Sequence, residues 1–400
     1  MSGRVASIKS RAMVLGRGST ALGVIRALGQ KGASLIAADY IKHGIAALSK
    51  YVQERVIIPD PRVSTEATIS FLVDNSAKWR GSLLIPTDDC ILVALSQYKA
   101  KLSEHYIVPV PEWGVVEKCV NKKMALQVAT EVGIRIPQSF FPNSVDYLEE
   151  HKAEFWYPCI LKPVFSRKFI DEFKVKVFET NDFEELKSYY YLATKAGNQM
   201  VIQEIIPGTA EQLYAYYAYR DSAGDLLAEF TYRKIRQSPP SFGTGTAIES
   251  TYTPEIMELG RRFLDKLGYT GICEIEFKRD ARDSQFKFIE INARFGNQVS
   301  LPVRCGVDLP WILYQDLING EKVRVDSYQV GVKWGDLSSD LSTFARYYRK
   351  KYGWGKFIKT YMGNKASAIY QRDDLKPFVI EWLSLLSRFP NFLFRLLLRR

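Results

Sequence analysis

The sequence has few histidines and no closely spaced pair of cysteines. Its 400 residues include three histidines, which lie far apart, and five cysteines, none of which forms a Cys-x-x-Cys pair. Zinc sites and dithiol redox sites usually need such clusters, so we expect neither. An odd number of cysteines without a recognisable secretion signal favours a reduced, cytoplasmic protein.

Long apolar runs are also missing, and acidic residues are outnumbered. No apolar stretch reaches the roughly 20 residues that a membrane-spanning helix needs. The formal net charge is +11, and much of it lies in the last sixty residues. Such a localised charge argues against a nucleic-acid groove along the whole chain, and we expect no nucleic-acid partner. Length and a hydrophobic content of 46% indicate a globular protein of two or three domains.

Polar side chains share one face of a predicted strand that begins at Phe286 and is ended by Arg294, Phe295 and Gly296. Glu290, Asn292 and Arg294 stand at alternate positions, so they point to the same side. Each would be costly to bury without a partner. Mg²⁺ would satisfy the first two, because it prefers oxygen ligands that include carboxylates and phosphates. The pattern predicts a magnesium site, with Arg294 facing phosphoryl or acyl oxygens.

A second predicted strand, residues 271–277, precedes this one. The polar link at residues 278–285 predicts an antiparallel hairpin. Glu274 and Glu276 share one strand face, and one of them can lie opposite Glu290 to complete a site with two carboxylates. The alternative is a solvent-facing strand with scattered acids.

This strand pair resembles the metal-binding strands of the ATP-grasp superfamily, which carry Glu on one strand and Glu-x-Asn-x-Arg on the next. The superfamily includes biotin carboxylase, carbamoyl-phosphate synthetase, D-alanine ligase and many carboxylate–amine ligases. The resemblance implies that Glu276 and Glu290 bridge metal ions and that Asn292 is a third ligand. It also implies that Arg294 lies near the transferred phosphoryl group. The sequence GVDLP at residues 306–310 strengthens the resemblance.

The resemblance covers roughly residues 113–325 and implies a nucleotide site. In the family, an early lysine starts a helix, and a later strand ends in a second nucleotide lysine. Here these positions fall to Lys122, within a helix predicted over residues 116–133, and to Lys162. The alternative for Lys122 is a position on an exposed helix surface.

The predicted strand at residues 200–206 resembles the family's hinge, over which adenine lies. That resemblance implies that the backbone from Glu204 to Ile206 reads the adenine edge and that Glu211 binds ribose. An acidic face on an ordinary strand is the alternative. The preceding lid would span about residues 138–198.

The lid segment at residues 164–173 departs from the family. Many relatives carry a glycine-rich phosphate flap there, whereas this segment contains no glycine and is expected to be a loop. Arg167 and Lys168 are candidate phosphate contacts in its place.

A Gly-x-Gly-x-x-Ala fingerprint near the N-terminus indicates a dinucleotide-binding type of fold. Gly16, Gly18 and Ala21 follow a short apolar stretch, and Asp39 ends the next predicted strand. Such a turn exposes backbone amides at a helix N-terminus, where an anion can bind. One interpretation is therefore an NAD(P)-dependent oxidoreductase; the other is a scaffold domain, with which ATP-grasp proteins commonly begin.

Two further pairs are candidate substrate contacts. Asp88 and Asp89 follow a predicted strand at its carboxyl end, where open α/β sheets bind ligands, or they cap the next helix. Lys234 and Arg236 precede a Gly/Thr loop and suit an anionic ligand; the alternative is a surface loop.

We predict a mixed α/β and α+β fold in three parts. Residues 1–112 would form a Rossmann-like domain, residues 113–325 an ATP-grasp domain, and residues 326–400 a basic helical extension. The segment at residues 385–400 is apolar with interspersed cations, so it either contacts a membrane surface or packs on its own protein.

The predicted function is ligation that depends on ATP and Mg²⁺ (or Mn²⁺). A small-molecule carboxylate would attack ATP to give an acyl phosphate, and an amine or similar nucleophile would displace phosphate. The alternatives are the NAD(P) oxidoreductase and an ATP-binding module without catalysis.

Overall fold

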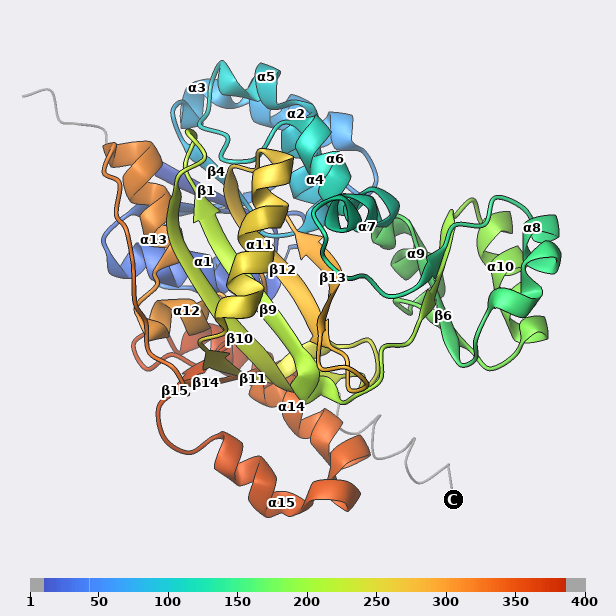
Figure 1. Cartoon of the computed structure of the whole chain (residues 1–400). Helices are drawn as coiled ribbons and strands as arrows, with labels where there is room; N and C mark the ends of the chain where they lie inside the picture. Colours follow the sequence, from blue (N-terminus) through green and yellow to red (C-terminus); the bar gives the residue numbers. More distant parts are fainter. Residues whose placement is uncertain (1–10, 43, 386–400) are drawn as a thin grey trace, which may run out of the picture. The chain divides into compact units, whose positions relative to one another are not determined.

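The structure, a computed structural model, describes residues 11–42 and 44–385 (Figure 1). Packing divides the chain into two compact units. The first comprises residues 1–109, 295–323 and 332–400, and the second comprises residues 110–294 and 324–331. Each unit joins segments that are far apart in sequence. The predicted boundaries after residues 112 and 325 instead cut the chain into three continuous parts.

The N-terminal segment of the first unit is the predicted Rossmann-like layer. Its strands pair in parallel in the order β3-β2-β1-β4. The inner strands are short apolar runs with almost every residue buried, as in sheets covered on both faces. The elements are β1 (Arg11–Leu15), α1 (Gly18–Gln30), β2 (Ser34–Asp39), η1 (Ile45–Leu48), β3 (Glu54–Ile57), α2 (Thr65–Asp74), α3 (Ser76–Trp79), β4 (Leu83–Pro86), α4 (Asp89–Gln97) and α5 (Lys99–Ser103).

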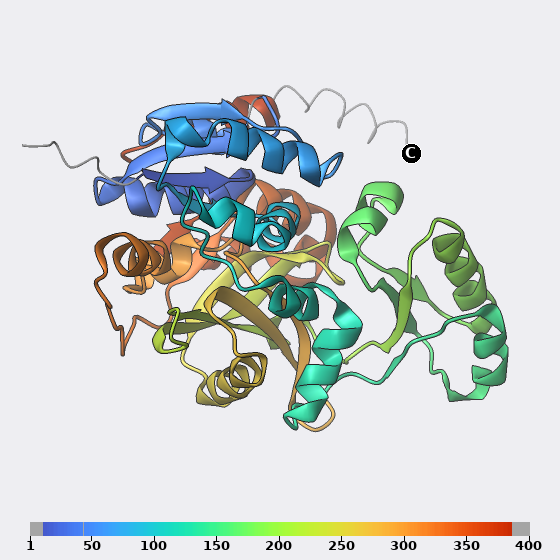
Figure 2. The ribbon, with the colours of Figure 1, turned by 90° about the horizontal axis from the view of Figure 1, so that it is seen from above.

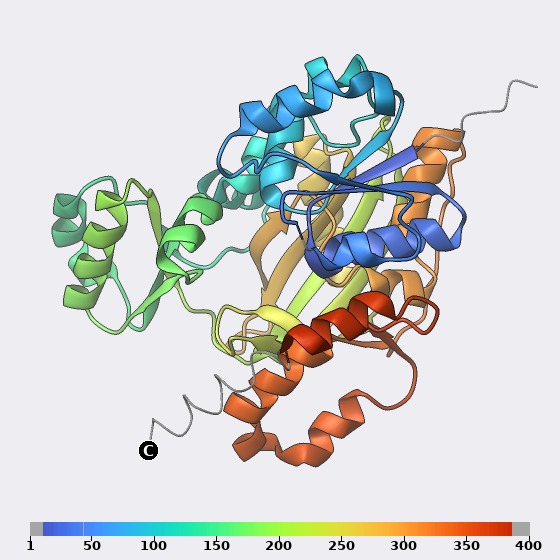
Figure 3. The ribbon, with the colours of Figure 1, turned by 180° about the vertical axis from the view of Figure 1, so that it is seen from behind.

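The rest of the first unit is helical apart from two short parallel strands, β14 and β15. Residues 337–360 are divided between a short α-helix, a π-helical turn and a second α-helix. Figure 3 shows this helical part from behind. The elements are α12 (Ser300–Cys305), α13 (Leu309–Tyr314), η4 (Gln315–Asn319), β14 (Lys333–Gly335), α14 (Leu337–Thr343), η5 (Phe344–Tyr348), α15 (Arg349–Thr360) and β15 (Lys365–Ser367).

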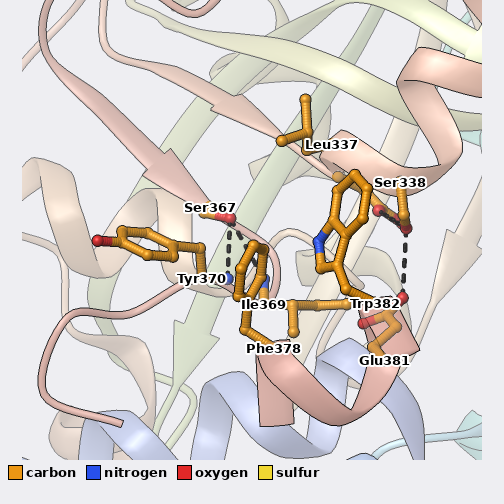
Figure 4. A pocket seen from close by; sticks show the side chains of 9 residues that line it. Leu337, Ser338, Ser367, Ile369, Tyr370, Phe378, Glu381 and Trp382 are labelled. Carbon is orange, nitrogen blue, oxygen red and sulfur yellow. Dashed lines mark hydrogen bonds between the residues drawn. The ribbon is translucent and has the colours of Figure 1, made fainter. Parts of the chain in front are cut away.

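The last described helix, residues 376–385, packs on α14 and the chain after β15. Phe378 and Trp382 line a small pocket there with Leu337 (Figure 4). Glu381 accepts a hydrogen bond from the hydroxyl of Ser338 at 3.2 Å. This part of the extension therefore packs on its own protein, whereas residues 386–400 of the predicted membrane segment lie outside the described residues.

The second unit contains an antiparallel sheet with strands in the order β13-β12-β9-β10-β11. Helix α11 starts with Pro254, ends at Gly268 in a left-handed conformation, and packs on β9 and β10 (Figure 2). Asn121 divides the helix predicted over residues 116–133, because its side chain caps a new helix. The elements are α6 (Trp113–Val120), α7 (Lys122–Glu131), η3 (Ala210–Gln212), β9 (Leu213–Arg220), β10 (Leu226–Ser238), β11 (Thr244–Thr251), α11 (Pro254–Leu267), β12 (Gly271–Arg279) and β13 (Phe286–Asn292).

The predicted lid is a small sheet in the order β5-β8-β6-β7 with helices around it. The expectation of a loop at residues 164–173 was wrong, because Ser166–Phe173 form helix α9. This segment has no glycine to break a helix, buries Phe169 and pairs Arg167 with Asp171 one turn later. The elements are β5 (Ser139–Phe140), α8 (Val145–Glu150), η2 (Lys152–Glu154), β6 (Cys159–Pro163), α9 (Ser166–Phe173), β7 (Phe178–Thr180), α10 (Phe183–Lys195) and β8 (Met200–Glu204).

Candidate active site

The β12–β13 hairpin brings the predicted acids together. Its register puts Glu276 directly opposite Glu290 and Glu274 opposite Asn292. A register shift follows Glu276, so the regular ladder is interrupted beside the acidic pair. Alternation along both strands therefore gathers carboxylate and amide oxygens on one face of the sheet.

The carboxylate of Glu276 is paired with a buried lysine from β10. The Nζ atom of Lys234 lies 2.9 Å from Oε2 of Glu276, and their side chains are 7% and 15% exposed. Burial opposes the charge of Lys234, but Glu276 and the neighbouring acids outweigh it and raise the pKa of this lysine. Lys234 and Glu276 therefore form a buried ion pair directly beside Glu290.

Glu290 lies in a strongly positive environment. Burial raises its pKa, but nearby lysines outweigh burial, and the net shift of the pKa is downward. These lysines are Lys122, Lys162, Lys176 and Lys234. Within residues 11–42 and 44–385, Glu290 accepts no hydrogen bond, so its ionised oxygens are open to a cation.

Glu274 differs from its neighbour Glu276. It is 3% exposed and accepts hydrogen bonds from the Tyr232 hydroxyl at 2.6 Å and from Nδ2 of Asn292 at 3.2 Å. Burial, assisted by the charge of Glu276, raises the pKa of Glu274 to about 7. Its oxygens are engaged within the protein, which makes Glu276 the better partner for Glu290 in a metal site.

Asn292 and Arg294 continue the polar face of β13 beyond the acids. Because Asn292 donates through Nδ2 to Glu274, its Oδ1 atom is left on the side of Arg294, whose Nη2 lies 3.4 Å away. Both side chains are half-buried. The guanidinium thus stands next to the two-acid site, where charge on a transferred group would develop.

The two predicted phosphate lysines lie close enough to affect the same acid. Lys162 is the last but one residue of the buried strand β6, and its Nζ donates to Oε1 of Gln203 at 3.0 Å. Burial lowers the pKa of Lys162 to about 8, partly offset by Glu290. Lys122 is the first residue of α7 and donates to the hydroxyl of Ser166 at the start of α9.

The strand predicted over residues 200–206 ends two residues earlier, at Glu204, whose side chain has a structural role. Its carboxylate accepts from the Gln138 backbone amide at 2.8 Å and from Lys287 at 3.2 Å. The Ile206 carbonyl accepts from Nζ of Lys278 at 2.6 Å. Any adenine contact from Glu204 would therefore come from its backbone, as the resemblance implies, rather than from its carboxylate.

The remaining predicted residues are less closely tied to the acids. Asp88 caps α4 through its Oδ1 atom and accepts from the Tyr40 hydroxyl at 3.0 Å. Asp89 is in the first turn of that helix, in the first unit. Glu211 lies in the short helix η3 and is half-buried, and Arg236 is buried in β10 two residues after Lys234.

Lys176, between α9 and β7, is a charged residue of the site that the sequence analysis missed. Its charge acts on both Glu290 and Lys162, and its Nζ donates to the Thr244 hydroxyl at 3.0 Å. Thr244 belongs to the Gly/Thr loop that follows Lys234 and Arg236 in sequence. The only feature of the sequence that pointed to Lys176 was its position as a basic residue after a flap without glycine.

The oxygen donors suit a hard cation such as Mg²⁺. In the described part of the chain, no three His, Cys, Asp or Glu side chains are grouped to hold a metal ion. The donor set is instead two carboxylates and an amide, which Mg²⁺ accepts when substrate phosphates and water supply the other positions. The residues fit the metal only together with a phosphate ligand.

The glycine fingerprint is explained in part by packing. A Cβ atom at Gly16 would come within 2.3 Å of Oγ1 of Thr87, and Gly16 has a φ of 116°. Burial raises the pKa of Asp39 to about 6, and its Oδ1 atom accepts from the Ile41 amide. Gly16 is therefore required by the close approach of β1 and the end of β4, whether or not an anion binds there.

Comparison with known proteins agrees with this site. Residues 245–311 match the family model of the carbamoyl-phosphate synthase L chain, ATP binding domain. The chain is 27% identical over 255 residues to the D-aspartate ligase of Enterococcus faecium (strain Aus0004), an alignment that covers 61% of this chain. The chain therefore spans only about 60% of the length of that relative.

Two solved structures have similar folds. The L-amino acid ligase of Bacillus licheniformis gives a TM-score of 0.60 at 16% identity, covering 80% of this chain and 79% of that one. The second is the biotin carboxylase domain of the Hydrogenobacter thermophilus 2-oxoglutarate carboxylase in complex with MgADP. Its TM-score is 0.62 at 18% identity, and the match covers 80% of this chain and 73% of that one. The chain is therefore similar to ATP-grasp proteins in its fold and in the matched region, in keeping with the predicted resemblance. No helix among the described residues is long and apolar enough to cross a bilayer.

Proposed function

We propose that this protein is a Mg²⁺- and ATP-dependent ligase that joins a carboxylate to an amine through an acyl phosphate. The observation that carries the proposal is Glu276 opposite Glu290, with four lysines from separate segments of the second unit acting on Glu290. The family model for an ATP-binding domain and the two ligases among the similar proteins support it.

Glu276, Glu290 and Asn292 would hold Mg²⁺, which would neutralise phosphate charge and polarise the phosphoryl group when bound. Lys122 and Lys162 would bind the phosphates of ATP. Phosphates would stabilise the charged form of Lys162, whose buried ammonium lacks a carboxylate partner at hydrogen-bond distance in the described structure.

Arg294 would stabilise the charge that develops during phosphoryl transfer. A substrate carboxylate oxygen would bond to the γ-phosphorus of ATP as the bond to ADP breaks, and an amine would then displace phosphate at the acyl carbon. Lys234 and Arg236, both buried on β10, are placed to attract the anionic acyl substrate. No side chain of the protein needs to form a covalent bond.

Amino acids are the first substrates to test, because two similar proteins are named as amino-acid ligases. A phosphate-release screen with ATP, Mg²⁺ and amino acids in pairs tests the proposal. Phosphate release that requires both an acid and an amine would support ligation. Release that is independent of any acid would favour the ATP-binding module without ligation.

The pH dependence of nucleotide binding provides a further prediction. Lys162 carries its charge below its pKa of about 8 and loses it above, so ATP affinity should fall as pH rises through that range. Bound phosphate moves the transition upward. Calorimetric titration with ATP between pH 7 and pH 9.5 should show that the affinity falls on the order of tenfold across this range.

The matched control for this titration is Lys162→Arg, because arginine stays charged at all these pH values. Its affinity should vary less with pH than that of the wild type, even if its absolute affinity is lower. A wild-type affinity that is constant over the range would contradict the assignment of Lys162 to phosphate binding.

We also propose that the Gly16–Asp39 segment is a scaffold and not a nicotinamide site. NADH and NADPH should then show no saturable binding at micromolar concentrations in a fluorescence titration. The close packing of Gly16 against Thr87 gives the glycine a structural reason of its own. Saturable binding of either nicotinamide cofactor in the micromolar range would restore the oxidoreductase interpretation.

A further inference from the structure

Residues 341–372 combine a strong positive charge with exposed apolar side chains. This segment contains eight Lys and Arg residues and no Asp or Glu. It includes η5 and α15, which Figures 1 and 3 show as the orange helices outside the β14 and β15 strands. Such a one-sided charge distinguishes it from the mixed surface of an ordinary globular domain.

Apolar side chains on α15 point to solvent at one-turn intervals. Trp354 and Ile358 are 48% and 57% exposed, and Met362, one turn further along the chain, is 63% exposed. Lys356 and Lys359 are exposed beside them. We call these five residues the α15 face. Large apolar residues interleaved with lysines are typical of helices that lie on membranes.

Another side of α15 is packed against its own unit, and the half-exposed ring of Trp354 borders it, with its centroid 5.3 Å from that of Phe344. Phe357 is buried and stacks near the buried ring of Phe344, with ring centroids 4.9 Å apart. The hydroxyl of Tyr361 donates to the fully buried Asp340 at 2.8 Å. These contacts fix which side of the helix faces inward, so the α15 face is not a misplaced part of the core.

Charge limits what can cover the α15 face. Residues 386–400 carry four arginines and no acid, so electrostatics do not favour that segment as the occupant. A second copy of the chain would bring the same positive segment. An anionic partner is favoured instead, and the aliphatic side chains of Ile358 and Met362 suit acyl chains better than they suit nucleic-acid bases or phosphates.

We propose that the α15 face binds the surface of an anionic lipid bilayer. Lysines would contact lipid headgroups while Trp354, Ile358 and Met362 enter the boundary with the acyl chains. This inference is independent of the proposed ligase activity, since it uses none of the residues assigned to ATP, metal or substrate.

Flotation of the full-length protein with vesicles tests the proposal. Vesicles of equal parts phosphatidylglycerol and phosphatidylcholine should carry the protein at about 0.1 M salt, and about 1 M salt should weaken binding because charges are then screened. Vesicles of phosphatidylcholine alone should bind much less. Wild-type protein that fails to float with the anionic vesicles would overturn the proposal.

Two double variants separate charge from apolar insertion. Lys356→Glu with Lys359→Glu and Ile358→Ser with Met362→Ser should each lower affinity for the anionic vesicles at least about tenfold. The matched control, Lys42→Glu with Lys101→Glu, makes the same change of net charge at exposed lysines elsewhere and should bind nearly as the wild type does. Melting curves confirm that all variants are folded.

Other occupants give different results. If both α15 variants float as the wild type does, another segment binds the lipid and the proposal is wrong. If the protein binds RNA or heparin and this binding tolerates Ile358→Ser with Met362→Ser, while the anionic vesicles do not bind, the face is a site for soluble polyanions. Either result contradicts a lipid-binding α15 face.

Discussion

Glu290→Gln is expected to lower Mg²⁺- and ATP-dependent turnover at least about a hundredfold while the protein stays folded. Glu290 is the ionised carboxylate that four lysines surround and that accepts no hydrogen bond from the described residues. Glutamine keeps the shape of the side chain but removes the charge that holds a divalent cation. Steady-state phosphate release at saturating ATP, with varied Mg²⁺, measures the effect.

The binding of metal-free ATP should respond in the opposite direction. Removing a negative charge among Lys122, Lys162 and Lys234 leaves those lysines more attractive to phosphate, so affinity for metal-free ATP should be kept or increased. This contrast separates loss of a metal ligand from general damage to the site. A folded Glu290→Gln protein with wild-type turnover would exclude the metal assignment.

Glu274→Gln is the internal comparison for this prediction. Glu274 lies on the same strand as Glu276, but its pKa of about 7 means that much of it is already protonated at neutral pH. Glutamine should therefore cost less there than at Glu276, which lies directly opposite Glu290 in the proposed metal site. Equal losses at both positions would indicate that Glu274, too, holds the metal.

Arg294→Ala is expected to reduce turnover by about a hundredfold to a thousandfold with little change in ATP affinity. The guanidinium lies beside Asn292 at the end of the acidic face, where we propose that it faces the transferred phosphoryl group. Its contribution should therefore appear in kcat, while the lysines keep the nucleotide bound.

The control for this prediction is Arg233→Ala. That arginine also lies in the second unit, on β10, but is paired with Glu249 at 2.9 Å and has no role in the proposed chemistry. Its kcat should stay within about threefold of the wild type. If Arg294→Ala instead weakened ATP binding and left kcat unchanged, the arginine would have a role in nucleotide binding only.

The β12–β13 hairpin could be predicted because strand alternation and a short turn determine the faces of its strands. Glu290, Asn292 and Arg294 follow the two-residue period, and the polar link between the strands allowed only a hairpin. The choice between Glu274 and Glu276 required the register. Long-range pairing of β10 then revealed Lys234 as the partner of Glu276, which no local pattern contains.

The lid and the units were harder to predict. Residues 166–173 form helix α9 where a loop was expected. The prediction followed the glycine-rich flaps of the family and gave too little weight to the local helix propensity of this segment. Lys176 was missed because its effect on Glu290 arises only when the lid folds. The units combine distant segments through tertiary packing, which sequence periodicity does not record.

Trapping with hydroxylamine tests the central claim most directly. An acyl phosphate reacts with hydroxylamine to give a hydroxamate, even when the natural amine is not supplied. With ATP, Mg²⁺ and the correct carboxylate, the wild-type protein should form hydroxamate and ADP in equal amounts, and Glu290→Gln should form neither above background. Release of AMP and pyrophosphate, or carboxylate-dependent ADP without any hydroxamate, would contradict a ligase that acts through an acyl phosphate.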